Sequence, residues 1–514
     1  MNRPAGTENF SPDFSPVVRR RWLQEITEQP IPLLIIGGGI TGAGILLDAS
    51  SRGIQAILLE QADFASGTSS RSTKLIHGGL RYLKDFKLAL VREVGKERAI
   101  LRNNAPYLIK PQPMLLPVRQ GGSLGMFSAR MAIRLYELLI GVRPEERNHK
   151  HTRDEICSLY PVLRPEGLLG GITYTEYLTD DARLVMEVLK TGIQHGGKAA
   201  NYCQVIGIRR DAGYFVVTCL DTIENKQFEL KASQVVNASG PWVDRVRKLE
   251  DSSVPDSLTL SKGVHIVLKA GVLPLTSAVY FDTHDGRMVF AIPRAETCYV
   301  GTTDTFYAHP PEALDVEQAD INYLVACLHD AFQVSIDPER DIIASWAGLR
   351  PLVSEPGKQA GEVSRKDEIF ISPDGLISIA GGKLTGYRKM AEKVTNLIGQ
   401  NLKTSFVPCK TKNLALVGTS TDEPETLIER IVSKAGAPHL HRIKELVSRY
   451  GQAALHICAQ ATECEWIDTE FQYCLQHEML LREEDFWLRR SADFYFNPAR
   501  MQQYKGQVSI MMQA

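Results

Sequence analysis

A glycine-rich turn after an apolar strand constrains this chain more than any other feature. An apolar run leads into a Gly-x-Gly-x-x-Gly turn at residues 37–42. With this spacing Gly37 makes the tight turn, Gly39 lets a pyrophosphate approach the backbone, and Gly42 lets the next helix pack close to the strand. The first N–H groups of that helix then face the phosphates. The sequence therefore predicts a binding site for a dinucleotide cofactor.

An acidic residue at the end of the next apolar run completes the pattern. The helix that begins at Ile40 is expected to run to about Arg52 and to end at Gly53. The following apolar residues end at Glu60, whose carboxylate can accept hydrogen bonds from an adenosine ribose. Residues 31–60 are thus predicted to form a βαβ unit.

Composition narrows the class of protein. A chain of 514 residues is too long for one core and suggests two or three domains. A formal net charge of −1 argues against a general nucleic-acid binder, which would carry a large basic excess. Nine cysteines without a Cys-x-x-Cys pair fit free thiols and indicate neither a disulfide framework nor a metal site. No signal peptide or spanning helix is apparent, so membrane contact would be at the surface.

The order of elements suggests three regions. Residues 1–30 are expected to form a polar N-terminal arm that packs loosely. A helix is predicted over residues 84–104, and an apolar segment at 124–142, interrupted by Arg130 and Arg134, is either a core helix or an interfacial one. Beyond about residue 405 the pattern is mostly helical, with Trp466 and Trp487 as expected core anchors.

The spacing of further glycine turns favours a flavin over a nicotinamide cofactor. Turns near Gly240 and Gly381 lie far from the first one, which suits a long FAD held by distant segments. We expect an FAD-binding domain over residues 31–400, with an interleaved β-rich substrate domain formed by about 80–180 and 240–350. Residues 401–514 are expected to form a C-terminal helical domain.

Six short motifs carry a resemblance to a known family. In order along the chain they occupy residues 67–83, 180–184, 262–265, 301–304, 348–352 and 381–385. Together they resemble the signature of aerobic-type, FAD-dependent glycerol-3-phosphate dehydrogenases. The resemblance implies an α/β fold with a Rossmann-like FAD-binding domain of the D-amino-acid-oxidase and glutathione-reductase type, a β-rich substrate domain and a C-terminal helical domain.

The resemblance and the glycine turns together supply the predicted cofactor contacts. The hydroxyl groups of Ser69, Ser70 and Thr73 are expected to form hydrogen bonds with the cofactor phosphates or ring edges. His77 is expected to support the flavin ring. The helix that Gly382 opens is expected to direct its N-terminal dipole at the flavin pyrimidine edge. The predicted cofactor-binding residues are Gly37, Gly39, Gly42, Glu60, Ser69, Ser70, Thr73, Lys74, Leu75, His77, Gly240, Gly382, Leu384 and Thr385.

Oxidation of glycerol 3-phosphate also needs a base and cations for a dianionic phosphate. His265 is the best candidate for the general base, since imidazole titrates near neutrality. Lys383 could instead stabilise the alkoxide, and the sequence leaves the two roles open. The predicted catalytic residues are His265, Arg350 and Lys383, and the predicted substrate-binding residues are Arg81, Tyr82 and Arg365.

Two residues depart from the family pattern. Ser239 stands where the family commonly has Thr, which preserves the hydroxyl group. Arg294 stands where a Trp is frequent, and we expect this change to alter the rim of the pocket or the electron-acceptor side.

The resemblance implies the oxidation of sn-glycerol 3-phosphate to dihydroxyacetone phosphate, with hydride transfer to FAD and electrons passed to a membrane quinone. The alternatives are an oxidase that uses oxygen, a D-amino-acid-oxidase-like enzyme, and a catalytically inactive flavin-binding regulatory protein. We expect a peripheral protein at the bilayer surface, on the cytoplasmic side of the bacterial inner membrane. The oligomeric state is left open, with a homodimer among the alternatives.

Overall fold

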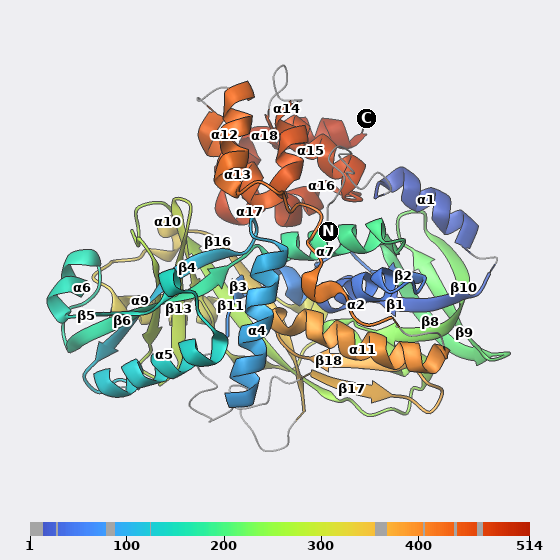
Figure 1. Ribbon diagram of the computed structural model, residues 1–514, viewed down its shortest axis with the longest axis horizontal. Coiled ribbons are helices and arrows are strands. Elements are labelled where there is room, and N and C mark those ends of the chain that lie inside the picture. Colours follow the sequence, from blue (N-terminus) through green and yellow to red (C-terminus); the bar gives the residue numbers. More distant parts are fainter. Residues whose placement is uncertain are drawn as a thin grey trace.

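The chain builds two β-sheets that lie side by side, with the C-terminal helices packed over them (Figure 1). The computed structural model describes residues 14–26, 29–78, 88–123, 125–354, 367–403, 407–435, 439–459 and 466–513. All statements below concern these residues.

The first sheet is mostly parallel and has β1 at its centre. Its strands are β1 (Ile31–Ile36), β2 (Ala56–Leu59), β7 (Lys198–Ala200), β8 (Cys203–Asp211), β9 (Tyr214–Asp221), β10 (Lys226–Asn237), β17 (Asp367–Ile371) and β18 (Ile377–Gly381). β1 pairs in parallel with β10 on one side and with β2 on the other. The carboxyl ends of these three strands therefore meet at one edge, where ligands bind in open α/β sheets.

Helices cover both faces of this sheet, which explains why β1 is apolar throughout. Leu33 and Ile35 pack into a core shared with α2 (Ile40–Ser51), α7 (Asp181–Gln194) and α11 (Tyr387–Leu402). Leu34 and Ile36 pack on the opposite face, against residues of α1 (Pro16–Glu25) and α8 (Val243–Glu250). A parallel strand buried on both faces loses the alternation seen in half-exposed strands.

The second sheet places the predicted base and an arginine on neighbouring strands. Its strands are β3 (Leu75–Ile76), β4 (Lys110–Arg119), β5 (His149–His151), β6 (Leu168–Leu178), β11 (Leu258–Leu268), β12 (Ala278–Asp282), β13 (Met288–Arg294), β14 (Thr297–Gly301), β15 (Thr305–Tyr307) and β16 (Ile342–Val353). β11 and β16 pair antiparallel, with His265 opposite Trp346 and Ser261 opposite Arg350. This register brings His265 and Arg350 to one part of the sheet.

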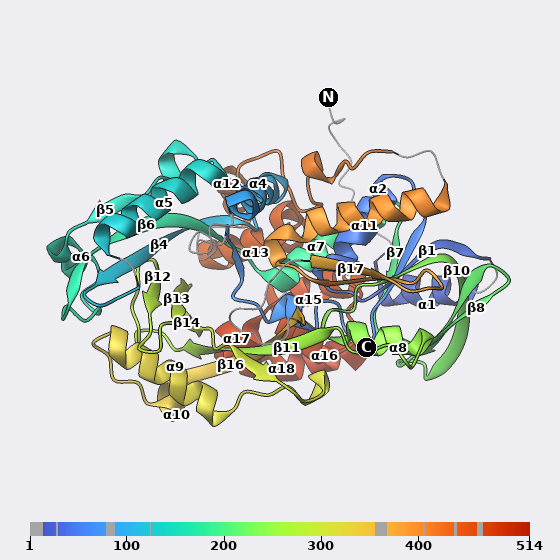
Figure 2. The ribbon, with the colours of Figure 1, turned by 90° about the horizontal axis from the view of Figure 1, so that it is seen from below.

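The remaining helices flank the second sheet or form the C-terminal layer, as the two views show (Figures 1 and 2). Those beside the sheet are α4 (Leu88–Asn104), α5 (Met126–Ile140), α6 (Arg153–Leu159), α9 (Gln318–Ala331) and α10 (Pro338–Asp341). The C-terminal ones are α12 (Pro424–Ala435), α13 (Leu440–Tyr450), α14 (Ala454–Ala459), α15 (Trp466–His477), α16 (Glu483–Asp485), α17 (Asp493–Phe496) and α18 (Pro498–Gln513). Within the described residues, no helix combines the length and the apolar character that crossing a bilayer requires.

The expectation of a loosely packed N-terminal arm is wrong for residues 16–25. These residues form α1, which Ser15 caps through its side chain. Arg19 is buried and pairs with Asp221 on β9 at 2.9 Å, and Trp22 packs against the first sheet. The partner of Arg19 lies 202 residues away in sequence, so local patterning did not reveal it.

The other predicted helices agree with the structure in the described residues. α2 begins at Ile40 and ends one residue before the predicted Arg52. α4 covers 88–104 of the predicted 84–104, and residues 84–87 lie outside the described part. Trp487 is buried in the core of the C-terminal helices, whereas Trp466 is only partly buried against it. The domain boundaries themselves stay a prediction.

Candidate active site in a cavity between the two sheets

The glycine turn has the backbone geometry that its spacing predicts. Gly37 has a φ of +113°, in the region that favours glycine. A Cβ atom on Gly42 would lie 1.9 Å from the carbonyl oxygen of Gly37, so only glycine lets α2 approach the turn this closely. Gly42 does not line the cavity described below, which makes it a packing residue rather than a direct contact.

The N-terminus of α2 and Glu60 close this turn. The Ser69 hydroxyl accepts a hydrogen bond from the backbone N–H of Ile40 at 3.0 Å, which satisfies one donor of the first turn. The Glu60 carboxylate accepts the N–H of Gly38 at 2.6 Å and that of Ala62 at 2.9 Å. Burial raises the pKa of Glu60. Each of its oxygens keeps a second lone pair for a hydroxyl donor.

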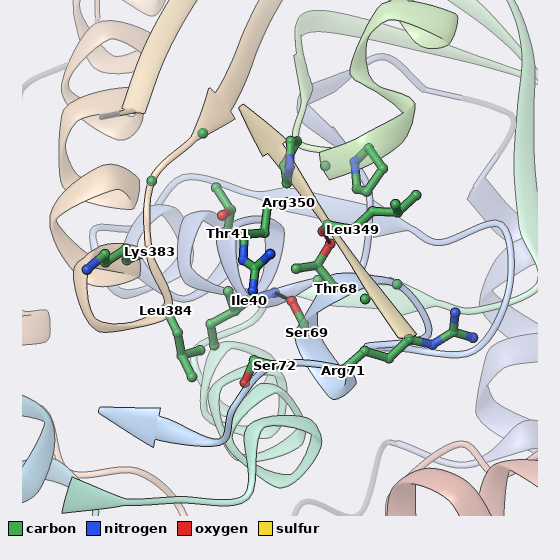
Figure 3. A pocket seen from close by; sticks show the side chains of 18 of the residues that line it. Ile40, Thr41, Thr68, Ser69, Arg71, Ser72, Leu349, Arg350, Lys383 and Leu384 are labelled. Carbon is green, nitrogen blue, oxygen red and sulfur yellow. Dashed lines mark hydrogen bonds between the residues drawn. The ribbon is translucent and has the colours of Figure 1, made fainter. Parts of the chain in front are cut away.

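A cavity of about 1180 Å³ brings most of the predicted residues together. Figure 3 shows Ile40 and Thr41 of α2, Thr68 and Ser69, Arg350 of β16 and Lys383 around one space. The predicted residues that line it are Gly37, Gly39, Glu60, Ser69, Thr73, Leu75, His77, Gly240, His265, Arg350, Gly382, Lys383, Leu384 and Thr385. Arg81, Tyr82 and Arg365 lie outside the described residues.

Ser70 and Lys74 are not part of the cavity wall. Lys74 is buried and pairs with Asp181 of α7 at 2.5 Å, while its Nζ also donates to the carbonyl of Ser70 at 2.9 Å. Asp181 also accepts hydrogen bonds from the N–H and the hydroxyl of Ser72 and from the N–H of Ala182. The Lys74 ammonium is therefore engaged in a structural ion pair, because a buried lysine must be paired. The cofactor contacts of Lys74 and Ser70 stay predictions.

His265 is held in a dry, aromatic environment. Its side chain is 2% exposed and stacks on the Trp346 ring with a centroid distance of 4.8 Å. Its Nε2 lies 3.1 Å from the Thr73 hydroxyl oxygen. Burial, together with the positive charges of Arg350 and Lys74, holds the pKa of His265 well below 6.5. The imidazole is therefore neutral at pH 7, the state that a general base requires.

Arg350 and Lys383 are two of the positively charged residues in the cavity wall, which also contains Arg71, Arg245 and Arg287. The Arg350 guanidinium pairs with Asp304 at 3.3 Å and donates to the Thr302 hydroxyl at 3.1 Å. The guanidinium also donates to the Ser261 hydroxyl at 3.4 Å and to the Thr303 carbonyl at 3.5 Å. Lys383 follows β18. Burial raises the pKa of Glu176, and the charge of Lys383 opposes this rise in part.

The turn after β18 differs in detail from the expected helix start. Gly382 has a φ of +79°, and residues 384–386 form a single 3₁₀ turn before α11 begins at Tyr387. The Thr385 hydroxyl donates to the carbonyl of His77 at 3.2 Å, which joins two predicted cofactor segments.

The two departures from the family pattern have different outcomes. Ser239 lines the cavity, and its hydroxyl donates to Asn237 at 2.6 Å. Arg294 does not line the cavity, which disagrees with a place at the rim, whereas an effect on the electron-acceptor side stays a prediction. It pairs with Asp180 at 2.7 Å and lies 3.9 Å over the ring of Phe496, because the C-terminal helices pack against β13 there.

Sequence reasoning missed three residues that support this site. Trp346 stacks on His265, Asp181 anchors the loop before β3, and Asp304 orients Arg350. Asp181 and Asp304 stand in the motifs at residues 180–184 and 301–304. The sequence alone assigns no role to the residues of these motifs. Acidic residues inside such motifs were the available signal. Among the described residues no group of three histidines, cysteines or carboxylates could hold a metal.

The cavity wall fits a dinucleotide. At Gly39 a Cβ atom would come within 3.1 Å of the Ser69 hydroxyl oxygen, so glycine leaves room beside the α2 N-terminus that a side chain would fill. That terminus carries a partial positive charge suited to phosphates, and Glu60 lines the same space.

Comparison with known protein families and structures agrees with this geometry. Residues 33–388 match the model of FAD dependent oxidoreductases, and residues 409–514 match that of the C-terminal domain of alpha-glycerophosphate oxidase. The aerobic glycerol-3-phosphate dehydrogenase of Bacillus subtilis (strain 168) is 42% identical, with 97% of this chain and 94% of the relative covered. The enzyme of the same name from Staphylococcus aureus (strain MRSA252) is 43% identical, with 93% and 90% covered.

A solved structure is similar over nearly the whole chain. The glycerol-3-phosphate dehydrogenase from Bacillus halodurans, complexed with FAD, is 38% identical with a TM-score of 0.82. The alignment covers 97% of this chain and 93% of the other.

Proposed function

The chain belongs to the family of FAD-dependent glycerol-3-phosphate dehydrogenases, and we propose that it oxidises sn-glycerol 3-phosphate to dihydroxyacetone phosphate and passes the electrons to a membrane quinone. The family, the fold class and the FAD cofactor predicted from the sequence are confirmed. The quinone and the bilayer contact are supported by features of the cavity and of α5.

The residues proposed to hold FAD are those of the glycine turn, the α2 N-terminus, Glu60 and the segment after β18. Bound FAD supplies the hydride acceptor. The chain's own contribution is to hold the pyrophosphate at the α2 terminus and the ribose at Glu60.

The observation that carries the proposal is a neutral histidine in a cavity whose wall also contains Arg350 and Lys383. His265 would accept the proton of the substrate C2 hydroxyl, while Arg350 and Lys383 bind the phosphate dianion. Charge-assisted hydrogen bonds of this kind contribute about 1.5–3 kcal/mol each. The low pKa of His265 favours it over Lys383 as the base, since an ammonium can stabilise an alkoxide but cannot take its proton.

An apolar part of the cavity supports a quinone as the electron acceptor. It is lined by Leu90, Leu116, Ala132, Tyr174, Tyr280, Met288 and Phe290. Tyr280 and Phe290 stack at 4.1 Å, which is a flat aromatic surface of the kind that a quinone ring contacts. Ala132 lies on α5, so this part of the cavity reaches that helix.

The outer face of α5 supports contact with a bilayer. Phe127, Met131, Leu135 and Leu138 follow helical spacing and are exposed, Phe127 and Leu138 by 80% each. Ile133 and Tyr136 on the opposite face are buried, as a core helix predicts, and the exposed apolar face supports the interfacial alternative. Arg130 and Arg134 are exposed beside the apolar stripe. We propose a peripheral position on the cytoplasmic side of the bacterial inner membrane.

Replacing Phe127 and Leu138 together by Glu is expected to lower the fraction of protein that sediments with anionic lipid vesicles by tenfold or more, since burying each side chain contributes about 1.5–3 kcal/mol. Arg130→Glu with Arg134→Glu is expected to act in the same direction. Val17 is 65% exposed on α1, away from α5, so Val17→Glu is the matched control and should sediment like the unaltered protein (Figure 1). Unchanged sedimentation of the α5 variants would remove this helix as the anchor.

Turnover in vesicles distinguishes the quinone acceptor from the oxidase alternative. With glycerol 3-phosphate and a short-chain quinone, the enzyme is expected to reduce the quinone faster than it produces hydrogen peroxide in air. Faster peroxide formation would identify an oxidase instead.

A further inference from the structure

A bridge of three side chains joins the two sheets at one edge of the cavity. Trp242 is the last residue of a 3₁₀ turn that follows β10, and Arg245 lies on α8. Glu312 belongs to another 3₁₀ turn, Pro311–Ala313, between β15 and α9 on the side of the second sheet. The Glu312 carboxylate accepts the Trp242 indole N–H at 2.7 Å and hydrogen bonds from the Arg245 guanidinium at 2.6 and 3.0 Å.

This bridge lies where the cavity meets the surface of the molecule. Trp242 and Arg245 line the cavity, and Glu312 contacts both of them. The side chains of Arg245 and Glu312 are each 49% exposed. Because Arg245 both lines the cavity and reaches solvent, it stands at the edge of the cavity. Glu312 therefore holds two parts of the wall together from the solvent side.

The Trp242 ring packs against the loop that caps the phosphate end of the cavity. A Cβ atom on Gly67 would come within 3.0 Å of this ring, so glycine lets the indole lie close to the loop. Two residues further on, the Ser69 hydroxyl accepts the N–H of Ile40 at the start of α2. The N-terminus of α2 is the part of the wall that suits a pyrophosphate. The bridge is therefore next to the phosphate end of the cavity.

The Arg245 guanidinium is committed to this bridge. Its two terminal nitrogens donate to Glu312, one to each carboxylate oxygen. Such a bidentate pair is the favoured geometry for an arginine and a carboxylate. A phosphate of FAD would have to displace Glu312 to take the same two nitrogens. The structure therefore assigns Arg245 to the bridge and leaves the phosphates to the N-terminus of α2.

We propose that Glu312 is a positioning residue for FAD: it holds Trp242 and Arg245 across the edge of the cavity and so slows the loss of the bound cofactor. The bridge joins a turn after the first sheet to a turn beside the second sheet. When it breaks, these two parts of the wall are free to separate at this edge, as a lid does when it opens. The inference rests on the FAD cofactor and not on the substrate or the electron acceptor.

The test measures how fast FAD leaves the holoenzyme after dilution into flavin-free buffer, with protein-bound flavin read by absorbance after rapid gel filtration. Glu312→Ala is expected to speed this loss by about 3- to 10-fold. Trp242→Phe and Arg245→Ala should speed it by smaller factors, since each removes only part of the bridge. Glu229→Ala is the matched control, because Glu229 pairs with Arg209 at 3.2 Å and these side chains are 52% and 53% exposed. Neither residue belongs to the cavity wall that the described residues form, so this variant should lose FAD at the unaltered rate.

A double-mutant cycle separates a bridge from independent contacts. Glu312→Ala combined with Arg245→Ala is expected to speed the loss of FAD no more than Glu312→Ala alone, because both changes remove the same contact. If the two factors multiplied, each side chain would act by itself and the inference would be overturned. An unchanged rate in Glu312→Ala would also overturn it, and so would a slower loss, which would show that the released Arg245 binds the FAD phosphates instead. These rates are measured without substrate, so they hold even if glycerol 3-phosphate fails to reduce the enzyme.

Discussion

Replacing His265 by Asn is expected to slow reduction of the bound flavin by glycerol 3-phosphate by about 10²- to 10⁴-fold, the usual contribution of a general base. Asn is similar in size and can lie against Trp346, but it cannot take a proton at neutral pH. The rate constant is measured by anaerobic stopped-flow absorbance at saturating substrate. His309, which is exposed, provides the control, and His309→Asn should leave the rate unchanged.

The pH dependence of the same rate gives a sharper check. Because burial and the charges of Arg350 and Lys74 hold the pKa of His265 well below 6.5, the base is already deprotonated at pH 6.5. Titration of His265 should therefore not change the rate of flavin reduction above pH 6.5. It should lower the rate only in more acid solution. His265→Asn should lack this acid limb. An acid limb centred at or above pH 6.5 in the unaltered protein would speak against His265 as the base.

Replacing Asp63 by Ala is expected to lower the free energy of unfolding by about 3–5 kcal/mol, the cost of leaving buried charges without their partner. Asp63 follows β2, and its carboxylate accepts hydrogen bonds from Arg489 at 2.6 Å and from Arg490 at 2.8 and 2.9 Å. Both arginines belong to the C-terminal helices and are buried. The substitution would thus weaken the contact between these helices and the first sheet. Urea denaturation followed by circular dichroism measures the change.

An exposed ion pair provides the comparison for Asp63. Arg20 and Glu224 lie 3.0 Å apart, with side chains 65% and 45% exposed. Glu224→Ala should change the unfolding free energy by no more than about 0.5 kcal/mol, as is usual for exposed pairs. If Asp63→Ala cost as little as Glu224→Ala, the C-terminal helices would not depend on this buried cluster.

The parts of the site that depend on local spacing could be predicted from the sequence. The turn at Gly37 and Gly39, the packing of Gly42 and the position of Glu60 all follow from one strand, one turn and one helix. His265 was recognised because it stands within a motif at the start of an apolar strand. These residues need no knowledge of distant contacts.

The parts that depend on distant contacts could not be predicted. Lys74 was expected at the cofactor. Its ion pair with Asp181 was not expected, because Asp181 lies 107 residues further along the chain. Arg294 was expected to affect the pocket rim or the electron-acceptor side, and nothing local indicates that Phe496 lies against it. Trp346 stacks on His265 only through the register of β11 with β16. Such pairings follow from the packing of whole sheets and helices.

An anaerobic titration of the purified protein with glycerol 3-phosphate tests the central claim most directly. The account predicts that the flavin absorbance bleaches as substrate is added and recovers rapidly when a soluble quinone is supplied. If the oxidised flavin spectrum persisted at saturating glycerol 3-phosphate, the assignment of the substrate to this cavity would be contradicted.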